Sequence, residues 1–464
     1  MLLGLSIYCT ACKKWLEVNP KTQVSERVLF ENEQGFKDAL VGVYTQMGNR
    51  TLYGKDFTMG LMDVLSRNYF ANARYASTYF EASKYNYTDA GTKNKIDSLW
   101  TTSYKAIANL NNLLAQVDQK KDLFTNNNFQ IIKGEALALR AFLHFDLLRA
   151  FGPVPIGNMQ TKAIPYVKAF NMDPKLKLSL QQVTDECLAD LNQASALLAV
   201  DKGVYTGTGD VFRSFTRNHM NYWATTGLMA RIYLYIDDKP KAYQKAKEVI
   251  NAKLFPFITS SNISGTVPDR TFATEHLFGL YVANLQAINA ELFKAAAGDA
   301  ALLPSSNTFI NNRFEISTGG STDYRYLYLW KTDGPTATKY PVKYWSDDIA
   351  VPSNFPITKR IPLIRLSEMY YIAAEASTDL NESINLLNEV RTNRGLAALP
   401  QTLNAAGLET ELFKEYKKEF YQEGQLFYYY KRKNRTQIEG YGPTVGPAVY
   451  VFPLPNDEIE FNPQ

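Results

Sequence analysis

The strongest constraint on the fold is a helical spacing of apolar residues in the first third of the chain. Between residues 97 and 117 an apolar residue recurs every three or four positions, on one face of a helix. These residues are Leu99, Tyr104, Ile107, Leu110, Leu113, Leu114 and Val117. A second such segment covers residues 129–151 and meets a stop signal at Gly152-Pro153. Two amphipathic helices that follow one another in this way favour a scaffold of paired helices.

Helix signals continue along the chain. Ser179 and Gln182 form a capping-box pattern for a helix that runs to about residue 198. The apolar spacing predicts further helices over residues 218–236, 239–253, 366–377, 381–393 and 409–432. We therefore expect a mainly α fold, a scaffold of helix pairs of the tetratricopeptide kind, although no clear 34-residue repeat signature is present.

Two long stretches, residues 51–92 and 255–362, interrupt the helical spacing. Both mix many aromatic residues with polar ones, and the second is also rich in Gly, Pro, Ser and Asn. Structureless loops of this length are uncommon in compact domains unless they have a function. We expect both to be insertions that pack over one side of the helical scaffold. They would then form a single domain with it, over residues 12–464.

The first residues resemble the end of a secretory signal. An apolar stretch, residues 1–8, precedes Cys9-Thr-Ala-Cys12, and a cysteine after two small residues is typical of a bacterial lipoprotein signal. Cleavage before Cys12 would make residues 1–11 a residual signal peptide and let Cys12 carry lipid. Two or three acyl chains give stable anchoring, at ~0.8 kcal/mol per buried CH₂. The alternatives are a short buried segment or a CxxC metal or redox pair.

Composition and motifs give little support for catalysis or for nucleic-acid binding. The chain has 50 basic and 46 acidic residues, and its densest basic cluster, residues 431–435, is too small for a phosphate-binding face. The three histidines are widely separated, and no HExxH, phosphate-loop or GxSxG motif occurs. Neither Asp237-Asp238 nor Asp347-Asp348 is a convincing glycosidase pair, because the side chains of sequence neighbours generally diverge. Asp237-Asp238 lies at an apparent helix end, where it is better explained as a turn. We expect no catalytic residue, no cofactor and no metal, with an all-helical glycosidase as the least favoured alternative.

Several motifs then appear in a fixed order. They are Lys133–Pro155, Ile361–Ala376, Leu387-Asn388, Val390-Arg391, Arg394-Gly395, Glu419-Phe420, Glu423-Gly424 and the ending from Phe452 to Pro463. In this order they resemble the SusD/RagB family of outer-membrane lipoproteins of Bacteroidota. Tyr416 and Gln425-Leu426 depart from the pattern, because many members of the family carry arginines there.

The resemblance implies a non-catalytic, lipid-anchored protein on the surface of the outer membrane. Such a protein captures an oligosaccharide and passes it to a SusC-like TonB-dependent transporter, over which it acts as a hinged lid. A RagB-like lid that binds peptides or proteins as nutrients is the alternative within the same family.

The interrupting stretches also supply the candidate ligand residues. Sugars present C–H faces that pack on aromatic rings and hydroxyl groups that need polar partners. The candidates in the first stretch are Asp63, Arg67, Asn68, Tyr69, Tyr75 and Tyr79, and those in the second are Asn312, Arg313, Tyr324, Tyr328 and Trp330. Trp330, Tyr69 and Tyr75 lead this set. The aromatic residues of the predicted helices, Trp100, Phe142, Trp223 and Phe427, are expected to be packing residues, and Cys187 a buried core residue.

Overall fold

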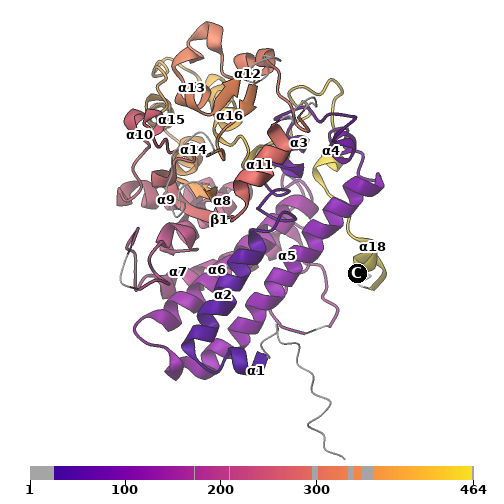
Figure 1. Ribbon diagram of the computed structural model, residues 1–464, viewed down its shortest axis with the longest axis vertical. Coiled ribbons are helices and arrows are strands. Elements are labelled where there is room, and N and C mark those ends of the chain that lie inside the picture. The colour runs from indigo at the N-terminus through magenta and orange to yellow at the C-terminus, as the bar shows by residue number, and fades with distance from the viewer. Residues whose placement is uncertain are drawn as a thin grey trace, which may run out of the picture.

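The computed structural model describes residues 26–171, 173–207, 210–294, 301–332, 339–346 and 359–461 (Figure 1). The candidate lipid-bearing Cys12, the residual signal peptide and Asp347-Asp348 lie outside these ranges. Within them, no helix is long and apolar enough to cross a membrane.

The N-terminal half contains a bundle of four long helices and one short one, in the lower part of Figure 1. Its members are α1 (Glu26–Leu29), α2 (Glu33–Met47), α5 (Ala90–Val117), α6 (Asn128–Phe151) and α7 (Leu180–Leu198). Helix α6 packs against both α5 and α7, and nearly every one of its side chains is buried. The reason lies in its sequence, which places alanines and large apolar residues on all sides and leaves no polar face.

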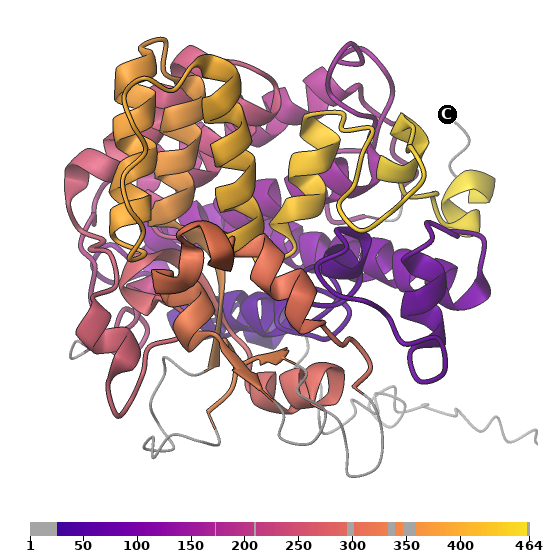
Figure 2. The same ribbon diagram turned by 90° about the horizontal axis from the view of Figure 1, so that it is seen from above.

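The C-terminal half continues the stack of paired helices. Its members are α8 (Tyr222–Tyr235), α9 (Lys239–Ala252), α14 (Leu366–Ala376), α15 (Leu380–Thr392), α16 (Ala405–Glu419) and α17 (Gln425–Arg432). Each helix from α7 to α9 packs on the next, α9 then packs on α14, and α14 on α15. The helices α14 to α17 stand in a row in Figure 2. A mainly helical fold is therefore confirmed.

Local signals predicted the helix ends well. The capping box of α7 is present, since Ser179 Oγ accepts the N–H of Gln182 and the Gln182 side chain accepts the N–H of Ser179. Helix α6 ends at Phe151 as predicted, although Gly152 is extended, with φ −75°, and not left-handed. Asp238 caps the start of α9 by accepting the N–H of Lys241, which confirms its interpretation as a turn residue.

One predicted helix, residues 409–432, is wrong, because the chain breaks between α16 and α17. Gln422 and Gly424 both have positive φ, +64° and +70°. A side chain at Gly424 is excluded, since its Cβ would lie 2.3 Å from the carbonyl oxygen of Phe57. The apolar spacing continues across this break and so gives no sign of it.

The two interrupting stretches contain more regular structure than the sequence indicated. Their elements are α3 (Leu61–Leu65), α4 (Ser77–Ala82), α10 (Ser260–Ser264), β1 (His276–Tyr281), α11 (Leu285–Phe293), α12 (Asn307–Arg313), α13 (Tyr324–Tyr328), β2 (Trp330–Thr332), β3 (Lys339–Pro341) and β4 (Arg360–Arg365). Strand β1 pairs antiparallel with β4, and β2 with β3. A last helix, α18 (Asn456–Phe461), follows near the C-terminus. The elements are too short to show a period in the sequence.

A buried charge cluster joins the second stretch to the helices. Glu419, at the end of α16, accepts hydrogen bonds from Arg325 of α13 (2.8 Å), Arg365 of β4 (2.5 Å) and Arg394 (2.6 Å). All four side chains are almost wholly buried. The three arginine charges hold the pKa of the Glu419 carboxyl well below its usual value, even though burial opposes this. The cluster therefore fixes α13 and β4 on α16.

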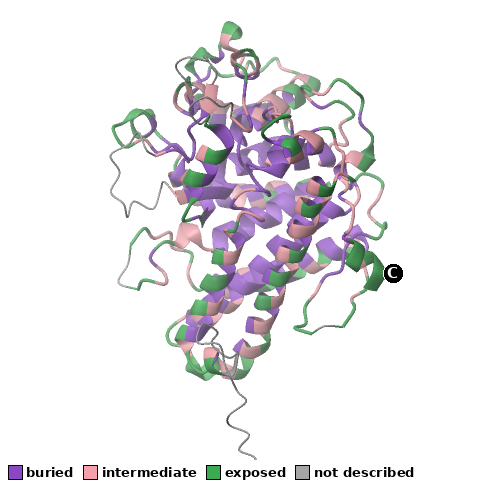
Figure 3. Cartoon of the chain, turned by 45° about the vertical axis from the view of Figure 1, so that its right-hand side comes forward, coloured by how far each residue is buried: buried purple, intermediate pink, exposed green. Residues whose placement is uncertain are grey.

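The buried apolar side chains form one connected cluster, whose members range in sequence from Phe30 to Phe452. Figure 3 shows the buried residues gathered in the interior of the molecule and the exposed ones on its outside. Trp100, Phe142, Trp223 and Phe427 belong to this core, as does Cys187, so their assignment as packing residues is confirmed.

Candidate functional site

The two interrupting stretches meet at one surface of the molecule. The backbone N–H of Phe70 donates to the oxygen of Pro304 (3.1 Å), and that of Asn72 to the oxygen of Leu302 (2.9 Å). The rings of Phe70 and Phe309 lie edge to face, with centroids 5.3 Å apart. Residues 67–80 and 301–313, more than 200 positions apart in sequence, therefore lie side by side.

Six of the eleven predicted ligand residues lie below this surface. Asp63, Asn68, Tyr69, Tyr79, Arg313 and Trp330 are all at least nine-tenths buried. Their surroundings explain this: Trp330 packs edge to face on Tyr421 (4.6 Å), and Tyr421 in turn on Tyr69 (5.4 Å). We correct the prediction accordingly and assign these six side chains to packing and internal hydrogen bonding.

Among the described residues, Asp63 has partners only inside the protein. Its carboxylate accepts the N–H groups of Gln422 (2.6 Å) and Gly424 (3.0 Å) and the hydroxyl of Tyr69 (3.2 Å). Burial dominates over these hydrogen bonds and raises the pKa of Asp63 to about 7. The side chain holds the break between α16 and α17, and it is not free for a ligand.

The predicted arginines are internal braces. Arg313 donates to Asn68 Oδ1 (2.5 Å) and to Glu439 (3.3 Å). Arg67 donates to the carbonyl oxygens of Ser83 (3.2 Å) and Gly440 (2.8 Å). Both guanidinium groups thus tie the first stretch to later parts of the chain, and this strengthens the junction under the shared surface.

The remaining four predicted residues reach solvent to different degrees. Tyr75 is 37% exposed, Asn312 is exposed, and Tyr324 and Tyr328 are half-buried on α13, with ring centroids 6.1 Å apart. Tyr75 and Asn312 belong to the two segments that the backbone hydrogen bonds join. Tyr324 faces a different neighbour, since its N–H donates to the oxygen of Arg394.

The accessible residues at the junction form what we call the rim patch: Phe70, Arg74, Tyr75, Phe309, Asn311, Asn312 and Tyr326. The guanidinium of Arg74 lies 5.2 Å from the centroid of the Tyr75 ring. The hydroxyl of Tyr326 donates to Asn311 Oδ1 at 3.0 Å. Sequence reasoning missed five of these residues as site residues: Phe70, Arg74, Phe309, Asn311 and Tyr326. Phe70, Arg74 and Asn311 each adjoin a predicted candidate, and Tyr326 lies two positions from Tyr324 and Tyr328.

The rim patch combines half-exposed rings with amide and guanidinium donors. Rings of this kind pack on C–H faces, and amides both donate to and accept from hydroxyl groups. The patch contains no Asp, Glu, His, Ser or Cys side chain that could act as a nucleophile or as an acid–base pair. Its chemistry is that of binding.

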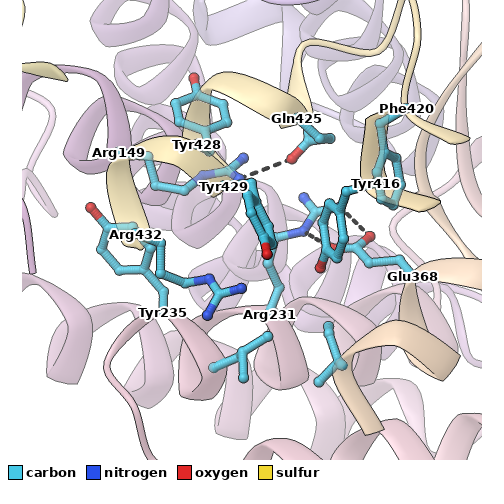
Figure 4. Close-up of a pocket in the computed structure, with 12 residues that line it drawn as sticks. Arg149, Arg231, Tyr235, Glu368, Tyr416, Phe420, Gln425, Tyr428, Tyr429 and Arg432 are labelled. Atoms are coloured by element: carbon cyan, nitrogen blue, oxygen red, sulfur yellow. Dashed lines mark hydrogen bonds and ion pairs between the residues drawn. The ribbon is translucent and has the colours of Figure 1, made fainter. Parts of the chain in front are cut away.

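A small cavity inside the helix stack is charged but cannot hold a ligand (Figure 4). Its volume is about 40 Å³, room for little more than a water molecule, whereas ligand pockets measure some hundreds of Å³. Arg231 pairs there with Glu368 (2.6 Å), and Arg149 donates to Gln425 (2.9 Å). Tyr416 and Gln425, two of the residues that depart from the family pattern, line this cavity, so their role here is internal.

Fold and surface together define a helical-repeat binding protein. The chain belongs to the SusD/RagB family: residues 14–234 match a family model described as "Starch-binding associating with outer membrane", and residues 311–456 match the model of the SusD family. Proteins of this family bind their ligands and are not enzymes, which confirms the expectation of no catalysis and removes the glycosidase alternative.

Individual relatives agree with this assignment. SusD-like protein P25 of Formosa agariphila is 18% identical over 88% of this chain and 83% of its own length, and SusD-like protein P38 of the same organism is 23% identical over 96% and 92%. A SusD superfamily protein of Bacteroides thetaiotaomicron superposes with a TM-score of 0.71 at 22% identity, over 93% of this chain and 98% of that one. A SusD-like carbohydrate binding protein of Bacteroides vulgatus gives 0.72 at 18% identity, over 93% and 96%. These structures confirm the fold.

Proposed function

We propose that this protein binds an oligosaccharide or polysaccharide at the cell surface and delivers it to a SusC-like TonB-dependent transporter. The observation that carries the proposal is the junction of residues 67–80 and 301–313, which places exposed rings and amides on one surface. The family description, starch-binding and associating with the outer membrane, supports it. So does the carbohydrate-binding relative from Bacteroides vulgatus, which shares the fold.

Capture in this proposal needs a shallow, preformed surface. Tyr75 and Phe309 offer ring faces for sugar C–H groups, and Arg74, Asn311 and Asn312 offer hydrogen bonds to hydroxyl groups. The patch rests on the hydrogen bonds of half-buried Arg67 and buried Arg313, so little order has to be gained when a ligand binds. Release to a transporter requires no covalent step, which fits a surface without catalytic groups.

An affinity gel containing polysaccharide tests the binding step. Tyr75→Ala should reduce the retardation of the protein several-fold, because the change removes a ring that is exposed in the free protein. Phe170→Ala is the matched control, since Phe170 is also exposed (51%) but lies outside the rim patch. Equal retardation of wild type and Tyr75→Ala on every glycan that binds would contradict the proposed site. Binding of peptides with no binding to any glycan panel would favour the RagB-like alternative.

Anchoring through Cys12 is a second part of the proposal. Acylation of the Cys12 thiol and amine would tether the domain to outer-membrane lipid, with the following residues as a leash. Mass spectrometry of the mature N-terminus should find an acylated Cys12, and Cys12→Ala should move the protein from the membrane to the soluble fraction. An unmodified Cys12 in the native protein would contradict the anchor.

The transporter partner can be tested in the native membrane. Tagged protein extracted in mild detergent should retain a TonB-dependent transporter at a fixed ratio, because a lid has to stay hinged to its barrel. The Tyr75→Ala variant should retain the same partner, since the rim patch is proposed to contact glycan only. Purification of the native protein as a monomer, with no transporter under any mild condition, would contradict the delivery step.

A further inference from the structure

A second hollow, unlike the rim patch, lies between the α7–α8 connection, α10 and the start of β4. Its volume is about 690 Å³, within the usual range for small-ligand sites. It shares no residue with the rim patch. The residues that matter for its chemistry are Phe215, Arg217, Val267, Asp269, Thr274 and Arg360.

Two arginines without acidic partners line this hollow. The side chain of Arg360 is only 5% exposed, yet it makes no hydrogen bond or ion pair with any other described residue. Arg217 likewise has no ion pair among those residues, and its one hydrogen bond, to the oxygen of Leu254, is 3.5 Å long. The Nε atoms of both side chains and Thr274 Oγ1 are buried without a partner. Arg217 is half-buried and Arg360 is buried. Buried guanidinium groups normally have an acidic partner, so Arg360 is an exception that calls for one.

The nearby carboxylate does not supply that partner. Asp269 uses its oxygens to hold its own turn, by accepting the N–H of Ala273 (2.7 Å) and the N–H and hydroxyl of Thr271 (both 3.2 Å). No ion pair joins Asp269 to Arg217 or Arg360 in the described part of the chain, although its charge opposes the lowering of both arginine pKa values. Burial and the charge of Arg217 lower the pKa of Arg360 to about 10, although Asp269 opposes this. Both guanidinium groups therefore line the same hollow, and together with Asp269 they give it a net positive charge.

The apolar wall of the hollow adds a second element of recognition. Phe215 is 37% exposed and Val267 38% exposed, and the Arg360 guanidinium lies 6.0 Å from the centroid of the Phe215 ring. A pyranose that packs on Phe215 would place a ring substituent near that guanidinium. Arginine recognises carboxylates and sulfates through two parallel hydrogen bonds.

We propose that this hollow, which we call the arginine pocket, binds an acidic saccharide unit, with its carboxylate or sulfate on Arg217 and Arg360 and its ring on Phe215. This inference rests on the proposed function only for the ligand class, a saccharide. It adds a separate site that selects for negative charge, whereas the rim patch offers neutral hydrogen bonds and rings.

Calorimetric titration with matched oligosaccharides tests the pocket. Wild type should bind oligogalacturonate or a sulfated galactose oligomer, and the one that binds more tightly identifies the anion as carboxylate or sulfate. The neutral galactose oligomer should bind at least tenfold more weakly. Arg217→Gln and Arg360→Gln should each lower affinity for the acidic oligomer at least tenfold and leave the neutral one unchanged. Arg50→Gln is the control, since Arg50 pairs with Glu291 away from the pocket.

Stability gives an independent readout. Removal of one of two unpaired like charges should leave the melting temperature of the free Arg360→Gln protein unchanged or higher, because repulsion is relieved. A drop of several degrees would assign Arg360 a structural role and overturn the proposal. Equal affinity of wild type and Arg217→Gln for the acidic oligomer would also overturn it.

The same titrations separate this proposal from the proposed function. Loss of acidic-oligomer binding in Tyr75→Ala but not in Arg217→Gln would place that ligand on the rim patch, supporting glycan binding and overturning the pocket. Loss in Arg217→Gln but not in Tyr75→Ala supports the pocket, whatever the rim patch binds.

Discussion

Asp63 and Gly424 are 361 positions apart, yet the Asp63 carboxylate accepts the backbone N–H of Gly424 at 3.0 Å. The same carboxylate accepts the N–H of Gln422, so one side chain of the first interrupting stretch holds the break between α16 and α17. Only glycine fits at position 424, because φ is positive there and a Cβ atom would collide with the carbonyl oxygen of Phe57. The loop surface and the helix stack are therefore built as one structure.

The substitution Asp63→Asn should destabilise the protein while sparing ligand binding. The amide oxygen can keep one of the two backbone N–H groups, but the amide NH₂ would face the other and leave it without an acceptor. A buried unsatisfied donor costs about 1–3 kcal/mol. Urea unfolding should show this loss, and the folded variant should bind glycan as wild type does. Unchanged stability together with lost binding would restore Asp63 as a ligand residue.

The difference in stability between wild type and Asp63→Asn should depend on pH. Burial raises the pKa of Asp63 from 3.8 to about 7, so the folded state holds its proton more tightly than the unfolded state does. Protonation of Asp63 therefore adds to the free energy of unfolding of the wild type. This contribution, on the order of 4 kcal/mol, is complete below about pH 4 and is lost as the pH rises through about 7. Urea titrations of both proteins at intervals from pH 4 to 8 measure it. A difference that does not change over this range would contradict the raised pKa.

The sequence predicted the helix stack because each long helix carries its own signals, such as the apolar stripe of α5 and the capping box at Ser179. The ligand residues were predicted less well for a physical reason. Rings mixed with polar residues suggest a surface, but Trp330 and Tyr69 are covered by Tyr421, a contact made across long sequence separations. No local pattern shows such a contact. Tyr75 and Asn312 are exposed among the described residues, as a ligand site at the surface requires.

Removal of the Glu419 charge at the centre of the buried cluster should lower the free energy of unfolding strongly. Glu419→Gln leaves Arg325, Arg365 and Arg394 buried with one carboxylate fewer among them. Breaking a buried ion pair from one side costs about 3–5 kcal/mol. Chemical denaturation should show a loss of that size, with α13 and β4 the first elements to exchange amide hydrogens.

Glu411→Gln is the matched control for that experiment. Glu411 pairs with Lys414 and Arg391 near the surface, where ion pairs contribute at most about 1 kcal/mol. Similar losses in the two variants would show that the Glu419 cluster is not the main attachment of the second stretch.

Trp330, the leading ligand candidate from sequence, should behave as a core residue. Its ring is 6% exposed and packs between Tyr421 (4.6 Å) and Phe314 (6.4 Å). Trp330→Ala should cost about 3–5 kcal/mol of unfolding free energy, as large buried aromatic residues do. Trp330→Phe keeps part of the packing, so it should cost less than half as much and leave glycan affinity unchanged. Tyr75→Ala should show the opposite behaviour, with stability within about 0.5 kcal/mol of wild type and weaker glycan binding. A Trp330→Phe variant of normal stability that no longer binds glycan would return this ring to the ligand site.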